Sequence, residues 1–326
     1  MTKLIHRRRL LVAALAPPAL GRVALAQAAW PTRPIRWIVA FAAGGAADTA
    51  ARAMAAEMQN SLGQNIVIEN RTGGNAVVAQ GAMLQSPRDG YTFLVDAANQ
   101  LTNPALMNDL PFNYNTDFVP VTQISSFPQV IAVKQDFPAR NITEFIAQAK
   151  ASPASITVGT PPAAGMAHLA LASFERQAGV RLLHAPYRGG ADAARDIMAG
   201  VIDAVLITTS SIRPPVAAGK ARVLAVTSLQ RVPSLPDTPT LAESGFPGFD
   251  LNDWNGLFAG AGTPRPVVQR MATVAAVAAK APAVRERMDP AGAIMIGNSP
   301  DAFAEWLTAQ RANALQVIRE ANITLG

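Results

Sequence analysis

The chain of 326 residues contains no cysteine, and only 15% of its residues are charged. Without cysteine it can form no disulfide scaffold, no thiolate nucleophile and no zinc site with a cysteine ligand. Aromatic residues make up only 6%, but apolar residues make up 50%, too many for a disordered chain. Because domains usually span roughly 100–200 residues, this length predicts two domains with cores of their own.

Acidic residues are also fewer than basic ones, at 22 against 28, but the excess lies at the N-terminus. Residues 1–26 contain five basic residues and no acid: Lys3, Arg7, Arg8, Arg9 and Arg22. An apolar stretch at 10–16 and the small-residue motif Ala24-Leu25-Ala26 follow the basic cluster. This order predicts a secretory signal peptide cleaved after Ala26. The three adjacent arginines leave general secretion and twin-arginine export both open.

Two prolines and Arg22 interrupt the apolar stretch before it reaches the ~20 residues that a membrane helix needs. Removing the five basic residues from 28 leaves 23 basic against 22 acidic residues, so the mature chain is close to neutral. A near-neutral chain without basic runs gives no support for nucleic-acid binding. We therefore predict an exported, periplasmic protein, and the absence of cysteine is compatible with that oxidising compartment.

The mature sequence contains two series of strand and helix patterns. In the first, strand patterns at 35–41 and 66–70 flank an amphipathic helix at 46–62 that ends before Gly63, and a strand at 91–95 follows. The second has expected strands at 156–159, 181–185, 201–207 and 222–226, with helices at 165–177 and 190–199. Strand, helix and strand in this order predict parallel sheets and an α/β fold.

Proline-rich connectors near 127–128 and across 232–249 indicate crossings between two domains. We therefore assign 27–124 and 249–326 to a discontinuous first domain and 125–248 to a second. The C-terminal part is expected to be helical at 264–281, and another helix begins with Ser299 as its N-cap and Pro300 in its first turn.

Three glycine-containing turns lead from a strand into a helix, at 41–48, 159–165 and 187–191. None matches a phosphate-binding motif such as G-x-x-x-x-G-K-[ST] or G-x-G-x-x-G. Small residues at a helix N-terminus allow an anion to approach free N–H groups, although glycine also simply permits a tight turn. Because three such turns occur in two domains, we favour a shared anion site between the domains.

Catalytic candidates are few, since the chain has only three histidines and shows neither a G-x-S-x-G nor an H-E-x-x-H motif. The rival interpretation is an exported α/β enzyme using His168 with Asp192 or Asp203. Packing or a solvated helical face explains His168 and Asp192 as well, and Asp203 is expected to accept backbone N–H bonds. We predict no catalytic residue, no metal site and no cofactor.

A set of ordered motifs covers nearly the whole mature chain, and together they resemble the Bug family of periplasmic substrate-binding proteins of tripartite tricarboxylate transporters. The motifs are Trp30-Pro31-Thr32-Arg33-Pro34-Ile35, Phe41-Ala42-Ala43-Gly44-Gly45, Asn70-Arg71-Thr72-Gly73-Gly74, Asp89-Gly90-Tyr91-Thr92, Ala185-Pro186-Tyr187-Arg188-Gly189-Gly190, Leu235-Pro236-Asp237-Thr238-Pro239-Thr240, Glu243-Ser244-Gly245, Gly256-Leu257-Phe258-Ala259 and Ala261-Gly262-Thr263-Pro264.

This resemblance implies a two-domain, venus-flytrap (type II-like) binding protein with two strands crossing the hinge and the ligand between the domains. It implies that backbone N–H groups of the first loop hold a ligand carboxylate, partly through water, and that segment 99–103 lines the first domain's edge of the cleft. The predicted ligand-binding residues are Phe41, Ala43, Gly44, Gly45, Ala46, Ala47, Asp48, Asn99, Thr160, Gly165, Met166, His168, Tyr187, Arg188, Gly189 and Asp203.

Two segments depart from the family pattern. The second loop, Thr160 to Gly165, contains two prolines where relatives carry serine and glycine, which removes N–H donors and hydroxyls. The segment 207–211 lacks the aspartate or asparagine often found after the position of Asp203. Both departures make an amino-acid or tricarboxylate ligand less favoured, and an aromatic or short-chain carboxylate more so.

The sequence thus predicts a monomeric, non-catalytic receptor that binds a small organic carboxylate and delivers it to a membrane permease. Domain closure is expected to follow ligand binding, since only the closed state lets the ligand contact both domains. Binding should be micromolar or tighter and sensitive to Gly45→Pro or to bulk at Gly189. A receptor that serves a sensor protein instead of a permease stays open as an alternative.

Overall fold

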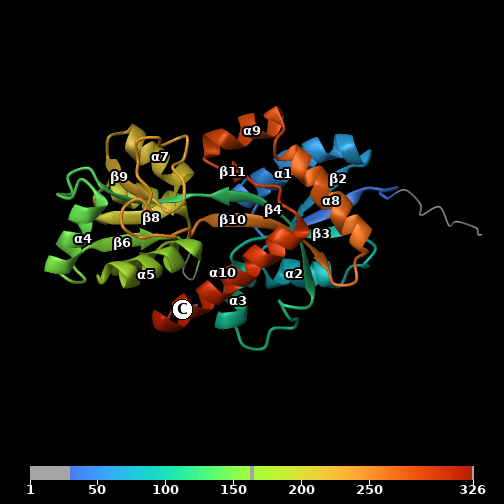
Figure 1. Ribbon diagram of the computed structural model, residues 1–326, viewed down its shortest axis with the longest axis horizontal. Helices are drawn as coiled ribbons and strands as arrows, with labels where there is room; N and C mark the ends of the chain where they lie inside the picture. The colour runs from blue at the N-terminus through green and yellow to red at the C-terminus, as the bar shows by residue number, and fades with distance from the viewer. Residues whose placement is uncertain (1–29, 162–164, 325–326) are drawn as a thin grey trace, which may run out of the picture.

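The computed structural model describes residues 30–161 and 165–324, and the predicted signal peptide lies outside them. The described chain forms two α/β lobes side by side, each built around one β-sheet (Figure 1). The sheet of the first lobe has six strands in the order β11-β4-β10-β3-β1-β2. That of the second lobe has five, in the order β7-β6-β8-β5-β9.

The first lobe is made from both ends of the chain. Its elements are β1 (Ile35–Val39), α1 (Ala46–Leu62), β2 (Ile66–Asn70), α2 (Val77–Leu84), β3 (Thr92–Asp96), α3 (Asn99–Leu106), β4 (Phe118–Phe127), β10 (Asp253–Gly260), α8 (Arg265–Ala278), α9 (Pro282–Met288), the short 3₁₀ helix η1 (Asp289–Ala291), β11 (Ile294–Met295) and α10 (Pro300–Glu320). Strand β1 pairs in parallel with β2 and with β3, which confirms the predicted parallel arrangement.

The second lobe is continuous in sequence. Its elements are β5 (Gln129–Lys134), α4 (Ile142–Ala151), β6 (Thr157–Thr160), α5 (Met166–Ala178), β7 (Leu183–Pro186), α6 (Gly190–Met198), β8 (Ala204–Thr208), α7 (Thr209–Ala217) and β9 (Ala221–Val226). Strand β6 pairs in parallel with β7 and β8, whereas β5 runs antiparallel to both of its neighbours.

Local sequence explains where several helices begin and end. Helix α1 ends at Gly63, which adopts φ 65°, a left-handed conformation that glycine reaches without steric cost. The buried face of α1 includes Met54 and Met58, one helical turn apart and both fully buried. Helix α10 begins as predicted, because the Ser299 hydroxyl accepts a hydrogen bond from the N–H of Ala302 and Pro300 occupies the first turn.

The chain passes between the two sheets twice. The first passage is short: β4 ends at Phe127, Pro128 follows, and β5 begins at Gln129. Proline suits this position because it supplies no N–H to a sheet ladder. The second passage runs from β9 to β10 over residues 227–252, where Thr240 forms a single parallel bridge with Val226.

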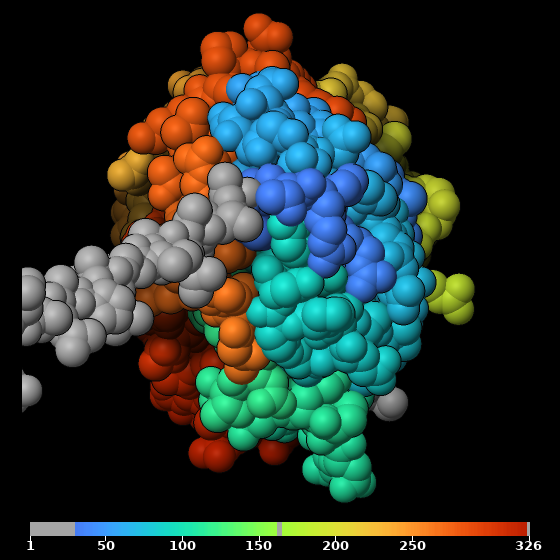
Figure 2. All heavy atoms as spheres, turned by 90° about the vertical axis from the view of Figure 1, so that its right-hand side faces the viewer, coloured from blue at the N-terminus to red at the C-terminus, as the bar shows by residue number. Residues whose placement is uncertain are grey.

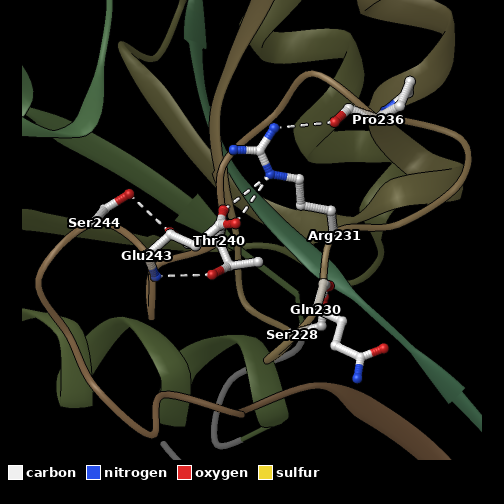
Figure 3. Close-up of polar contacts among 7 residues, drawn as sticks. All are labelled: Ser228, Gln230, Arg231, Pro236, Thr240, Glu243 and Ser244. Atoms are coloured by element: carbon white, nitrogen blue, oxygen red, sulfur yellow. Dashed lines mark hydrogen bonds and ion pairs between the residues drawn. The ribbon is translucent and has the colours of Figure 1, made fainter.

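The second passage is held by side-chain contacts of its own (Figure 3). The Glu243 carboxylate accepts hydrogen bonds from Arg231 Nε at 3.0 Å and from the Thr240 N–H at 2.8 Å. In return, the Thr240 hydroxyl accepts from the Glu243 N–H at 2.9 Å, the reciprocal arrangement of a capping box. The Arg231 guanidinium also donates to the carbonyl oxygen of Pro236. The prolines of this segment are thus part of an ordered turn.

The C-terminal part of the chain returns to the first lobe and completes it. Figure 2 shows residues coloured blue to cyan and residues coloured orange to red sharing one end of the molecule. Helix α10 packs on α3 and β4, and the side chains of Phe303 and Trp306 contact Trp254 of β10. Near its C-terminus α10 also reaches the second lobe, where Arg176 of α5 pairs with Glu320 at 2.9 Å. The domain boundaries assigned from the sequence, at 124/125 and at 248/249, stay a proposal.

The strand expected at 201–207 begins three residues later than predicted. The sequence pattern placed Asp203 inside a strand at 201–207, but β8 begins at Ala204. Gly200 adopts a left-handed conformation with φ 73° and turns the chain before the strand, so Asp203 lies outside the strand. Helices α2, α3, α4, α7 and α9 were not predicted from the sequence.

Candidate ligand-binding cleft

A cleft of about 360 Å³ lies between the two lobes, within the range of about 300–1,000 Å³ typical of small-molecule sites. The first lobe lines it with Phe41, Gly45, Ala46, Ala47, Asn75, Ala97, Ala98, Asn99, Thr102 and Asn103. The second lobe lines it with Pro161, Gly165, Met166, Ala167, Gly189, Gly190, Thr208 and Ser211, and the crossing strands add Gln129, Asp253 and Asn255.

Five helices begin at this cleft. The N-cap residues of α1, α3, α5, α6 and α7 all line it, namely Gly45, Ala98, Gly165, Gly189 and Thr208. This follows from the topology, because β1, β3, β6, β7 and β8 each direct their carboxyl ends to the same opening and a helix follows each. The first N–H groups of these helices have no partner within the helix, and the positive ends of the helix dipoles lie together.

These five N-caps differ from the N-caps of α4 and α10. At α4 and α10 a side chain accepts the hydrogen bond of a free helical N–H: Asn141 for α4 and Ser299 for α10. No N-cap side chain does so at the five helices that begin at the cleft, nor at α2, α8 and α9, whose N-caps do not line it. Glycine and alanine provide four of the five caps, so N–H groups in the first turns are left for a bound molecule or for water.

Among the described residues that line the cleft, Asp253 is the single ionisable side chain, and there is no lysine, arginine or histidine. An anion in this cleft would therefore be stabilised by backbone N–H groups and helix dipoles and not by a cationic side chain. Such sites suit a carboxylate, since helix N-termini bind anions without a basic residue.

The first loop is positioned by Asp48 in the first turn of α1. Its buried carboxylate accepts hydrogen bonds from the Gly44 N–H, Arg52 Nε and Asn70 Nδ2, each at 2.9 Å. Burial of Asp48 would raise its pKa, but these hydrogen bonds and the charge of Arg52 outweigh burial and lower the pKa to about 2. Asn70 also donates to the carbonyl oxygen of Phe41, so both ends of the loop are held.

A buried polar network supports the edge of the cleft formed by α3. The carboxylate of Asp96 is completely buried, which raises its pKa to about 6 although two glutamine side chains and one backbone N–H donate to it. One of these, Gln80, donates at 2.6 Å and accepts from the Tyr114 hydroxyl at 2.6 Å. Asn103 then donates to the oxygens of Tyr114 and of the Asn75 backbone. The network therefore holds two lining residues, Asn75 and Asn103, in place.

The strands that connect the lobes contribute Gln129, Asp253 and Asn255 to the cleft. Asp253 accepts a hydrogen bond from the N–H of Trp254 at 2.9 Å. Burial raises the pKa of Asp253 to about 6, against the opposing effect of that N–H. Asn255 donates to the hydroxyl of Ser125 on the neighbouring strand, and Gln129 lies almost wholly buried.

Eight of the sixteen predicted site residues line the cleft. They are Phe41, Gly45, Ala46, Ala47, Asn99, Gly165, Met166 and Gly189. The expectation that segment 99–103 forms the first lobe's edge also agrees with the structure, since Asn99, Thr102 and Asn103 line it. Whether each residue contacts a ligand stays a prediction.

The other eight are not among the lining residues: Ala43, Gly44, Asp48, Thr160, His168, Tyr187, Arg188 and Asp203. Asp48 points into the hydrogen-bond network behind the loop. Asp203 precedes β8, at the strand end opposite the cleft, where it pairs with Lys134 at 2.8 Å and accepts from the Thr157 N–H. Its expected backbone bond is thus present. Arg188 is exposed on the surface.

Thr160, His168 and Tyr187, which are also absent from the lining, contact other side chains of the second lobe. His168 stacks on His184, with ring centroids 4.0 Å apart, and His184 Nε2 lies 2.7 Å from the Thr160 hydroxyl. Burial and the neighbouring His184 lower the pKa of His168 to about 4, so His168 is neutral at pH 7. The Tyr187 hydroxyl donates to Asp196 at 2.8 Å. These side chains support the loops, and none of them is among the residues lining the cleft.

Sequence reasoning missed the residues on the connecting strands. Gln129 and Asp253 each begin a strand next to a passage between the sheets. The sequence signal that could have indicated this part of the site is the polar residue Gln129 directly after Pro128. The pairing of Asp253 with Phe127 across β10 and β4, which brings these positions together, depends on tertiary structure.

The catalytic rival receives no geometric support. Asp192 pairs with Arg195 at 2.7 Å and Asp203 with Lys134, so the two acids of that hypothesis have other partners. Within residues 30–161 and 165–324 no group of three or more metal-ligating side chains occurs. None of the helices in the described part of the chain is long and apolar enough to cross a membrane.

Two lobes joined by two passages, with a cleft at which the helices of both lobes begin, define a periplasmic-binding-protein fold. A family model described as "Tripartite tricarboxylate transporter family receptor" matches residues 50–323. The chain belongs to this family, and the resemblance stated from its motifs is confirmed.

Similar proteins support the same assignment. The chain is 35% identical over 318 residues, 97% of its length and 95% of the relative's, to the UPF0065 protein in the tcbD-tcbE intergenic region of Pseudomonas sp. (strain P51). It is similar to the structure of the periplasmic binding protein BugD, with 32% identity, a TM-score of 0.74 and coverage of 90% and 99% of the two chains. An R. palustris protein solved with adipate is 30% identical, with a TM-score of 0.78 and coverage of 90% and 99%.

Proposed function

We propose that this protein is a periplasmic receptor that binds a small organic carboxylate in the cleft between its lobes. The observation that carries this proposal is the convergence of five helix N-termini on a cleft without a basic side chain among its described lining residues. The adipate bound to the R. palustris relative supports a carboxylate ligand. A di- or tricarboxylate, an aromatic acid or a short-chain acid all fit this chemistry.

The receptor acts as a monomer without cofactor, and ligand binding closes the lobes. The ligand contacts the N-termini of α1 and α3 from one side and those of α5, α6 and α7 from the other. Because both sets of N–H groups can be satisfied together only when the lobes are close, ligand binding stabilises the closed state. The closed receptor delivers the ligand to permease subunits of a tripartite tricarboxylate transporter and does not transform it.

A thermal-shift screen tests the ligand class. Carboxylates of different length and charge are added to the mature protein, with neutral sugars as the comparison, and a specific ligand should raise Tm in a concentration-dependent way. A rise of Tm with sugars and none with any carboxylate contradicts the proposal.

An uptake experiment tests the partner. A host strain with and without the gene is supplied with the radiolabelled carboxylate that raises Tm most, and uptake should depend on the gene. Unchanged uptake, together with binding in vitro, would instead favour a receptor that serves a sensor protein. Conversion of the ligand by the purified protein, lost in His168→Ala, would favour the enzyme.

A further inference from the structure

Two residues that line the cleft, Asp253 and Asn103, carry side-chain acceptors with hydrogen-bonding capacity left over. Asp253 begins β10 and lines the cleft, and the hydrogen bond that its carboxylate accepts from a described residue, the Trp254 N–H, involves Oδ1. Asn103 lines the opposite edge, and both of its donated bonds involve Nδ2, which fixes the orientation of its amide. Its buried Oδ1 accepts no hydrogen bond from the described residues.

These acceptors are unusual in a site for anions. A ligand carboxylate placed against the helix N-termini leaves the rest of the molecule to meet Asp253 and Asn103. A second carboxylate there would meet a carboxylate of like charge in a partly buried position, where such repulsion is poorly screened. A hydroxyl or ammonium group would instead donate a hydrogen bond to each acceptor that it reaches.

We propose that Asp253 is a specificity-determining residue that selects carboxylates carrying a hydrogen-bond donor, a hydroxyl or ammonium group, at the end away from the helix N-termini. This inference rests on the proposed function and narrows it to a ligand class. It also predicts that a dicarboxylate binds well only after Asp253 has taken up a proton, because a protonated carboxyl can donate to the ligand's second carboxylate.

The pH range of that proton uptake follows from burial, which raises the pKa of Asp253 to about 6. No other ionisable side chain occurs among the described lining residues, so none offers a competing charge within the cleft. On the same segment, Asp250 bonds to Asn252 Nδ2 at 2.6 Å and is not a lining residue. On the paired strand β4, Phe127 lies opposite Asp253 and carries no charge.

The test uses four ligands of matched length that differ at one end: hexanoate, adipate, 6-hydroxyhexanoate and 6-aminohexanoate. Shorter series built on butanoate and succinate are measured in parallel. Calorimetric Kd values are determined at about pH 7.5 and about pH 5 for the wild type and for Asp253→Asn. Asparagine keeps the oxygen that accepts from Trp254, so the variant should fold. Asp250→Asn is the matched control for loss of a nearby carboxylate outside the cleft.

In the wild type at about pH 7.5 we expect the donor-bearing acids to bind about ten-fold or more tighter than adipate, equivalent to about 1.4 kcal/mol. Asp253→Asn should abolish the preference for the ammonium group and tighten adipate binding about ten-fold, whereas Asp250→Asn should change neither. The wild type should bind adipate more tightly at about pH 5 than at about pH 7.5. Asp253→Asn should not show this gain. The variant also serves as the control for protonation of the ligand itself.

Equal affinity of the wild type for all four ligands, unchanged in Asp253→Asn, would overturn the role of Asp253 while leaving a carboxylate receptor in place. If no carboxylate of any series binds either protein, the proposed function fails and the role of Asp253 fails with it.

Discussion

Replacing Asp48 by asparagine tests how the first loop of the cleft is held. The carboxylate of Asp48 accepts three hydrogen bonds, from the Gly44 N–H, Arg52 and Asn70. An asparagine side chain has one oxygen and one NH₂ group, so at least one of the three donors would face another donor. The substitution therefore breaks the network without creating a cavity.

The magnitude follows from the pKa of Asp48, which its hydrogen bonds lower from 3.8 to about 2 despite the opposing effect of burial. At about 1.36 kcal/mol per pKa unit, this corresponds to about 2 kcal/mol of stability at pH 7. Arg52 is 41% exposed, so solvent screens part of its attraction to Asp48. The stabilisation should therefore not exceed about 2 kcal/mol. Since the folded-state pKa is depressed, the contribution is complete above pH 3.8 and is lost as pH falls towards about 2.

Urea unfolding followed by circular dichroism measures the effect. Asp48→Asn should be about 2 kcal/mol less stable than the wild type at pH 7, and the difference should shrink to about 1 kcal/mol at pH 3. The control is Asp301→Asn, which changes an exposed acid in the first turn of α10 and should stay within about 0.5 kcal/mol. Carboxyl-carbon NMR should also show Asp48 titrating near 2. Equal stability of Asp48→Asn and wild type at pH 7 would refute the reasoning.

Three further predictions concern glycines of the cleft and a partly buried histidine. Gly190→Ala should lower the free energy of unfolding, measured in urea, by about 1–3 kcal/mol, because the new Cβ would lie 2.4 Å from Ser211 Oγ. In Gly189→Ala the new Cβ meets nothing within 4 Å, so this variant should be as stable as the wild type. It should nevertheless bind the ligand more weakly, because the methyl group occupies the cleft. Gly45→Pro removes the N–H that donates to the loop, and calorimetry should show about ten-fold weaker binding; unchanged affinity would contradict the role of this loop. Burial and His184 lower the pKa of His168 to about 4, so protonation of His168 opposes folding. Between pH 7 and pH 5 the free energy of unfolding should therefore fall by about 2 kcal/mol more in the wild type than in His168→Gln. An equal fall in both proteins would count against this prediction.

Element prediction succeeded where local signals agree with each other. Helix α1 and strand β2 have the predicted bounds because an amphipathic helix, a glycine stop and a β-branched run follow one another. The three glycine turns also lead into helices at the cleft, since strand ends and helix starts are local features. The start of β8 was predicted wrongly because the apolar run that contains Asp203 continues across a turn. The left-handed conformation of Gly200, seen in the structure, marks that turn, and β8 begins after it, at Ala204.

The sequence by itself determined the alternation of strands and helices, the small residues at the helix N-termini and the motifs of a receptor family. These features depend on neighbouring residues along the chain, which patterns can describe. Tertiary structure alone decided where the side chains lie: Asp48 is bonded behind its loop, Asp203 is at the far end of its strand, and Asp253 lines the cleft. Their directions depend on partners distant in sequence, such as Asn70 for Asp48 and the strand opposite Asp253, and no local pattern encodes those partners.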